Sequence, residues 1–142
     1  MIPPVKLQSS PLCAETLRTA AKSPKSGAVL AFEGCARDHS GGKQVAELSY
    51  SAYEPMALAE LSGIRGEALE MFSLNSCLIH HRIGTVPLGE ASVAIVCASP
   101  HRQNSLQAMS WILDELKKRT PIWKREHYED GGASWIEGGN KR

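Results

Sequence analysis

Two long segments of the chain repeat apolar residues at the three- and four-residue spacing of an amphipathic helix. The first begins at Pro55, and its apolar positions are Ala57, Leu61, Ile64, Ala68 and Met71. The second must end near Thr120, because Pro121 disfavours helical geometry in the residue before it. Its apolar positions are Leu106, Met109, Ile112, Leu113 and Leu116. A shorter helix is expected from Ser10-Pro11, an N-cap followed by a proline in the first turn, to about Ala21.

Strands are expected between these helices. Residues 28–34 form an apolar run typical of a buried strand, whereas residues 45–53 alternate apolar and polar side chains with one slip near Ala46. Residues 77–83 and 91–98 predict two further strands, and residues 133–136 a last extended piece. The polar, glycine-rich residues 38–43 predict a mobile loop. The pattern therefore indicates an α+β fold, with a mixed or antiparallel sheet and flanking helices, in one domain spanning residues 1–142.

Composition excludes several classes of protein. A chain of 142 residues with 42% hydrophobic and 22% charged residues is typical of a soluble globular domain. A net charge of +1 argues against a general nucleic-acid binder. No apolar run reaches the roughly 20 residues of a membrane span, and residues 1–6 lack the apolar core of a signal peptide. We therefore expect a cytoplasmic protein with reduced thiols at Cys13, Cys35, Cys77 and Cys97.

The most unusual local feature is a group of cations after the last predicted helix. Residues 117–126 place five of them around a proline and a tryptophan. The helix dipole accounts for lysines in the last turn, but not for Lys124 and Arg125 beyond the proline. His101 and Arg102 lie at the other end of the same helix, where backbone amides favour an anion. Cations at both ends of one helix suggest an anion pocket.

Lys117 and Lys124 are separated by the turn that Pro121 imposes. They could converge on a partly dry site, where a lysine can serve as a general acid or base, or each could be a solvated surface cation. Arg37 follows a predicted strand and precedes the glycine-rich residues, which suits a substrate contact. Adjacent histidines of a strand, such as His80 and His81, point to opposite faces, so we expect no metal site there.

Several short motifs together resemble the large, catalytic subunit of molybdopterin synthase. The resemblance runs from about Gly27 to Trp135. Its motifs are Gly27-Ala28, Phe32-x-Gly34-x-x-Arg37, Leu48-x-Tyr50-x-Ala52-Tyr53-x-x-Met56-Ala57, His81-Arg82-Ile83-Gly84, Ser99-x-His101-Arg102 and Lys117-x-x-x-Pro121-Ile122-Trp123-Lys124-x-Glu126. Each motif is weak alone, and their order and spacing make the match specific.

The resemblance implies an α/β-hammerhead fold in a homodimer. Each protomer would bind a small ubiquitin-like sulfur-carrier subunit, giving a heterotetramer, and the carrier's C-terminal Gly-Gly thiocarboxylate would enter a pocket of the large subunit. The substrate would be cyclic pyranopterin monophosphate, which receives two sulfur atoms to form the dithiolene of molybdopterin. No cofactor is implied.

The resemblance also implies roles for individual residues. Lys117 and Lys124 match the essential lysines of the family. The substrate-binding residues would be Arg37, His101, Arg102, Arg125, Glu126 and, beside Arg37, Cys35 and Ala36. Two other functions stay open: a non-catalytic anion-binding module that recruits a ubiquitin-like partner, and a sulfurtransferase that carries a persulfide on Cys35.

Overall fold

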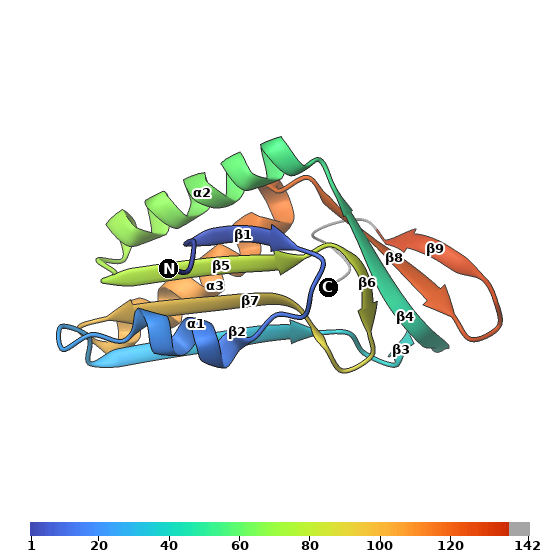
Figure 1. Ribbon diagram of the computed structural model, residues 1–142, viewed down its shortest axis with the longest axis horizontal. Helices are drawn as coiled ribbons and strands as arrows, with labels where there is room; N and C mark the ends of the chain where they lie inside the picture. Colours follow the sequence, from blue (N-terminus) through green and yellow to red (C-terminus); the bar gives the residue numbers. More distant parts are fainter. Residues whose placement is uncertain (137–142) are drawn as a thin grey trace.

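The computed structural model describes residues 1–136. Within them the chain forms three helices and nine strands, which are, in order, β1 (Val5–Gln8), α1 (Ala14–Ala21), β2 (Ala28–Cys35), β3 (His39–Ser40), β4 (Lys43–Ala52), α2 (Glu54–Met71), β5 (Ser76–Arg82), β6 (Gly84–Pro87), β7 (Ala91–Ser99), α3 (Arg102–Arg119), β8 (Ile122–Tyr128) and β9 (Ala133–Ile136). This content is α+β, as the sequence pattern predicted (Figure 1).

The first sheet has the strand order β1-β5-β7-β2 and is covered by helices on both faces. β1 runs parallel to β5, and the other neighbours are antiparallel. Along β7, Val93, Ile95 and Cys97 pack against α2 and α3, while Ala94, Val96 and Ala98 pack against α1. Burial of both faces explains why residues 91–98 are apolar without alternation.

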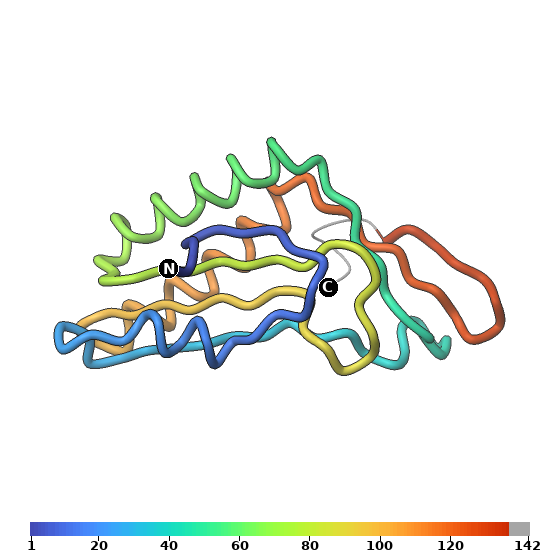
Figure 2. The backbone as a smooth tube through the Cα atoms, viewed as in Figure 1, coloured from blue at the N-terminus to red at the C-terminus, as the bar shows by residue number. Residues whose placement is uncertain are grey.

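The second sheet has the order β3-β4-β8-β9, and β6 pairs with β4 on the edge opposite β8. Figure 2 shows the backbone leaving the first sheet after β2, forming the second sheet with β4, and returning to the first through α2. A smaller core that includes Val45, Leu48, Tyr50 and Val86 lies on this sheet. The two sheets therefore meet around β4 and the end of β2.

The helix predictions are largely confirmed. The four fully buried positions of α2 are the predicted Ala57, Leu61, Ile64 and Ala68, whereas Met71, at the last helical residue, is 57% exposed. On α3, Leu106 is 54% exposed, and Ser105 and Ala108 take buried positions instead. α1 begins at Ala14 rather than at Pro11, with Cys13 in the N-cap position.

The strand predictions contain three omissions and one error of type. β1, β6 and β8 were not predicted, because short or cation-rich strands carry a weak apolar pattern. The expected mobile loop is a tight hairpin, in which Gly41 and Gly42 have φ of 56° and 80° between paired Ser40 and Lys43. Positive φ at both central residues is the geometry that favours glycine in two-residue hairpins. The slip near Ala46 is a register shift between Val45 and Glu47.

Arg119 joins the two long helices. Its guanidinium contacts three carboxylates, those of Glu60 and Glu67 on α2 and Glu115 on α3, at 3.2, 2.8 and 3.4 Å. A Cβ on Gly63 would lie 3.3 Å from this guanidinium, so Gly63 leaves room for the contact. Gly66 has no neighbour within 4 Å of such a Cβ, and packing does not require glycine there.

The space available to a Cβ differs between Gly27 and Gly66, and this difference predicts opposite effects of alanine at the two positions. A Cβ on Gly27 would overlap the backbone carbonyl oxygen of Pro100, so Gly27→Ala should lower the free energy of unfolding by about 1–3 kcal/mol. Gly66→Ala should raise it by about 0.5–1 kcal/mol, because glycine is a poor helix former and the site is open. Urea denaturation of both variants measures the two changes. Equal stability of the two variants would contradict the packing at Gly27.

Candidate active site

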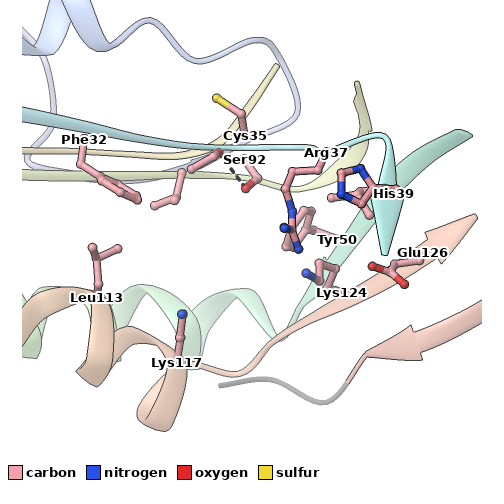
Figure 3. A pocket seen from close by; sticks show the side chains of 13 residues that line it. Phe32, Cys35, Arg37, His39, Tyr50, Ser92, Leu113, Lys117, Lys124 and Glu126 are labelled. Atoms are coloured by element: carbon pink, nitrogen blue, oxygen red, sulfur yellow. Dashed lines mark hydrogen bonds between the residues drawn. The ribbon is translucent and has the colours of Figure 1, made fainter. Parts of the chain in front are cut away.

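A cavity of about 340 Å³ lies between the two sheets and the C-terminal half of α3 (Figure 3). Strands β2 and β7 of the first sheet, strands β4 and β8 of the second, and helix α3 each supply part of its wall. The lining residues are Phe32, Gly34, Cys35, Arg37, His39, Leu48, Tyr50, Ser92, Val93, Leu113, Lys117, Lys124 and Glu126. Five of the nine site residues predicted from the sequence therefore line this one cavity: Cys35, Arg37, Lys117, Lys124 and Glu126.

The two lysines reach the cavity from different elements. Lys117 lies in the last turn of α3, four residues after Leu113, so both side chains share the helix face that lines the cavity. The helix ends at Arg119 with Thr120 as its C-cap, and β8 begins two residues after this cap at Ile122, which places Lys124 on the neighbouring wall. Both lysines are half-buried. The turn at Pro121 thus brings together two cations seven residues apart in sequence.

The register of β8 against β4 determines which side chains accompany Lys124. Tyr50 pairs with Lys124 and Leu48 with Glu126, and all four face the cavity because alternate residues of paired strands share a face. Glu126 is only 5% exposed, and its Oε1 accepts a hydrogen bond from the Tyr128 hydroxyl at 2.8 Å. The cavity therefore holds a carboxylate beside cations.

The segment after β2 contributes Arg37 and a residue that the sequence analysis missed, His39. The Arg37 side chain extends toward Tyr50 and Lys124 in Figure 3. The His39 ring Nδ1 lies 2.8 Å from Asp38 Oδ1, and this hydrogen bond lowers the pKa of the Asp38 carboxyl. The spacing of two from Arg37, in a segment that continues as a strand, is the signal that could have identified His39.

Ala36 does not line the cavity. Its side chain is buried in the smaller core, its N–H donates to the Glu90 carbonyl, and its carbonyl accepts from the Gly89 N–H. These contacts anchor the chain just before Arg37. The structure thus gives Ala36 a place in fixing the direction of Arg37 rather than a place in the cavity wall.

Arg125 also lies outside the cavity, which corrects the expectation that it lines the same pocket as Glu126. Neighbouring residues of a strand point to opposite faces, so Arg125 lies on the far face of the second sheet. There its guanidinium is 5.4 Å from the centre of the Trp135 ring, a cation–π contact. The error came from treating consecutive residues as neighbours in space.

His101 and Arg102 lie at the start of α3, and Lys117 lies near its end. At 1.5 Å per residue, the 15 residues from Arg102 to Lys117 separate them by about 22 Å along the helix. Both N-terminal residues are exposed. The single anion pocket expected from cations at both ends of the helix is therefore not formed within one protomer.

Cys35 borders the cavity, but its thiol is poorly suited to nucleophilic chemistry. Figure 3 shows the sulfur pointing away from Lys117 and Lys124. Partial burial, with a smaller contribution from the charge of Glu33, raises the pKa of the Cys35 thiol. Both effects disfavour the thiolate, which is the reactive form.

The cavity combines cations with an apolar wall. Lys117, Lys124 and Arg37 attract an anion, and Phe32 with Leu113 offers a surface for a flat ring. Within residues 1–136, no group of three or more His, Cys, Asp or Glu side chains is arranged to hold a metal ion. No helix in that range is long and apolar enough to cross a membrane. The arrangement suits binding of an anionic ring compound, with lysines placed for acid–base chemistry.

Comparison with known proteins identifies the family. Residues 7–119 match the profile of the MoaE protein family. A molybdopterin synthase catalytic subunit from Pyrococcus abyssi is 44% identical over 116 residues, covering 82% of this chain and 78% of the relative. One from Drosophila willistoni is 45% identical over 135 residues, covering 94% of this chain and 36% of that longer relative. The chain belongs to the MoaE family.

Solved structures agree with this assignment. Molybdopterin synthase from Staphylococcus aureus superposes with a TM-score of 0.90 at 32% identity, covering 96% of this chain and 98% of that one. A complex of subunits 1 and 2 of molybdopterin-converting factor from Helicobacter pylori contains a chain of the same fold, with a TM-score of 0.77 at 21% identity and coverage of 98% and 92%. Several curated relatives of this chain carry the name molybdopterin synthase catalytic subunit.

The environments of the exposed cysteines predict unequal reactivity. A hydrogen bond from the Thr16 side chain lowers the pKa of the Cys13 thiol, whereas burial raises that of Cys35. Because the thiolate fraction rises as pH passes the pKa, alkylation of Cys13 by iodoacetamide should reach half its maximal rate at a lower pH. Mass spectrometry of peptides after timed labelling measures both rates. Thr16→Val should move the Cys13 profile to higher pH and leave that of Cys35 unchanged.

Proposed function

We propose that this chain is the catalytic subunit of a molybdopterin synthase. It transfers two sulfur atoms from the thiocarboxylated C-terminus of a small ubiquitin-like carrier to cyclic pyranopterin monophosphate, forming the dithiolene. The observation that carries the proposal is the placement of Lys117 and Lys124, from α3 and β8, on one cavity with Arg37. The names of the curated relatives support the same activity.

The cavity has the chemistry that this substrate requires. Its volume of about 340 Å³ is within the range of small-molecule sites, and its cations can bind a cyclic phosphate. Arg37 provides a planar donor fork suited to phosphate oxygens, and Phe32 and Tyr50 provide ring surfaces for a pterin. The carrier's thiocarboxylate is itself an anion, so the same field attracts the tail.

The lysines supply the two effects that sulfur transfer needs. One effect is proton donation to the oxygen that leaves when sulfur replaces it, and the other is stabilisation of the oxyanion that develops on the carrier's carbonyl. Lys117 forms no ion pair with any of the residues that the structure describes, so its ammonium group is available to the substrate. Glu126 lies two residues from Lys124 on the same strand face.

The proposed assembly is a homodimer with one carrier bound to each protomer. This arrangement also gives His101 and Arg102 a place in substrate binding. Because they lie about 22 Å from Lys117 along α3, they can reach the phosphate only if a second protomer brings the start of its α3 to the cavity. We propose that each active site is shared in this way.

Further parts of the proposal concern the setting of the protein. We place it in the cytoplasm, where a thiocarboxylate donor and reduced cysteines are compatible. We treat the whole chain as a single domain, since β2 and β7 of the first sheet and β4 and β8 of the second line one cavity. The reaction needs no bound cofactor, nucleic acid or membrane.

The alternative in which Cys35 carries a persulfide has little support. Its sulfur points away from the lysines, and its raised pKa disfavours the thiolate (Figure 3). The other alternative, an anion-binding module without catalysis, gives no reason for two lysines to converge inside the cavity rather than at its surface.

The decisive experiment is a reconstituted reaction. The protein is mixed with thiocarboxylated carrier and cyclic pyranopterin monophosphate, and the product is examined by mass spectrometry for two added sulfur atoms. If no compound with added sulfur forms although the protein still binds the carrier, the protein is a non-catalytic module.

Substitution of the lysines should separate catalysis from folding. Lys117→Ala and Lys124→Ala should each lower the rate of product formation by about 100-fold or more, the usual scale for a general acid or an oxyanion contact. The matched control is Lys118→Ala, because Lys118 is the next residue of α3 and its side chain is 71% exposed. Circular dichroism checks the fold. A Lys117 variant as active as the Lys118 variant would remove Lys117 from the mechanism.

Sharing of the site between protomers can be tested by mixing variants. Arg102→Ala and Lys117→Ala should each be nearly inactive alone. If each cavity takes Lys117 from one protomer and Arg102 from the other, a mixed dimer has one intact site and one doubly defective site. Mixing the two variants under exchange conditions should therefore restore up to about a quarter of wild-type activity, since about half of the dimers are mixed and each has one intact site. No recovery, with mixed dimers shown by native mass spectrometry, would place Arg102 outside the shared site.

A further inference from the structure

Glu126 is joined to the protein surface by two hydroxyl groups. The Tyr128 hydroxyl donates to Glu126 Oε1 at 2.8 Å, and the same hydroxyl lies 2.5 Å from Ser134 Oγ. Glu126 is buried in the cavity wall, Tyr128 is half-buried and Ser134 is exposed. The three groups form a continuous hydrogen-bonded chain from solvent to the cavity.

The local fold holds these groups in line. Glu126 and Ser134 are directly paired across β8 and β9, and Tyr128 follows Glu126 by two residues on the same strand face. The connecting turn is closed by the Tyr128 N–H, which donates to the Gly132 carbonyl, and by Asp130, whose Oδ1 accepts from the Gly132 N–H. Backbone pairing, rather than chance rotamers, sets the spacing of the chain.

The direction of the hydrogen bonds follows from proton counting. A tyrosine hydroxyl has one proton, and Tyr128 donates it to Glu126. Ser134 must therefore be the donor in its contact with Tyr128, and because Ser134 is exposed its oxygen can accept a proton from water. The chain is oriented to move a proton inward, from water through Ser134 and Tyr128 to the Glu126 carboxylate.

We propose that Tyr128 and Ser134 are positioning residues that fix Glu126 and return a proton to it during turnover. This proposal rests on the proposed sulfur transfer. In that reaction a cavity lysine gives its ammonium proton to the leaving oxygen, so an N–H bond breaks and an O–H bond forms on the leaving group. The Tyr128 proton then moves to the Glu126 carboxylate and on to the neutral lysine, while the Ser134 proton moves to Tyr128 and a proton of solvent to Ser134. One proton passes from solvent to the cavity, Glu126 is again a carboxylate, and the relay regains its starting state.

The role predicts that the tyrosine hydroxyl matters more than its ring. Tyr128→Phe keeps the ring, which packs on the smaller core and lies 4.8 Å from the Lys43 ammonium, and removes only the relay oxygen. We expect its kcat to fall about 10-fold or more, with KM changed less than about 2-fold, since a proton route acts on turnover and not on substrate binding. Ser134→Ala should lower kcat by a smaller factor. Ser62→Ala, at an exposed serine of α2 outside the cavity, is the control and should have no effect.

Two measurements distinguish a relay from a purely structural role. The double variant Tyr128→Phe/Ser134→Ala should be no slower than Tyr128→Phe alone, because Ser134 acts only through the tyrosine oxygen. A small weak acid such as imidazolium should restore part of the kcat of Tyr128→Phe by supplying the proton directly. Wild-type kcat in Tyr128→Phe, additive losses in the double variant, or a loss that no small acid restores would each overturn the proposal. A wild-type protein that makes no product would instead overturn the proposed function itself.

Discussion

The antiparallel pairing of β8 with β4 is the constraint on which the candidate site depends. It places Lys124 opposite Tyr50 and Glu126 opposite Leu48, and it directs all four side chains to one face. The intervening residues, Trp123 and Arg125, are directed to the other face, and Arg125 contacts Trp135 there. A polar, cation-rich strand stays in the sheet because its backbone hydrogen bonds do not depend on apolar side chains. The side chains that face the cavity can therefore be selected for chemistry.

The end of α3 complements this strand. Three consecutive basic residues diverge because successive helix positions are rotated by about 100°. Lys117 faces the cavity, Lys118 faces solvent, and Arg119 contacts Glu60, Glu67 and Glu115 to hold α2 against α3. The ion pairs of Arg119 fix the helix that presents Lys117. The position of a functional cation thus depends on a structural cation two residues away.

Periodicity in the sequence predicted much of the fold because it reports burial. The inward face of α2 follows from the spacing of Ala57, Leu61, Ile64 and Ala68, and the irregularity near Ala46 corresponds to a real shift in strand register. Strand β8 escaped prediction because Lys124 and Glu126 occupy positions where the pattern expects apolar residues. Met71 and Leu106 were misplaced because helix ends extend past the surface that covers them.

The candidate site was predictable in its residue types and less so in its geometry. The presence of Lys124 beyond Pro121 has no explanation in helix electrostatics, and this singled it out. The location of Arg125 required knowledge of strand alternation in a strand that was not expected. The separation of Arg102 from Lys117 follows from helix length alone, and it was overlooked because both residues were interpreted as one charge cluster.

The connection between α3 and β8 is only Thr120–Pro121, so the number of residues between the helix and the strand determines which side chains reach the site. Insertion of one residue late in α3 would rotate Lys117 away from the cavity by about 100° and bring a different side chain to its place. A shift of one residue in β8 would exchange Lys124 and Glu126 for Trp123 and Arg125 on the cavity face. Substitutions can be absorbed one at a time, but a change in length between residues 113 and 126 alters which residues of α3 and β8 face the cavity. In this segment the spacing of residues is under as much constraint as their identity.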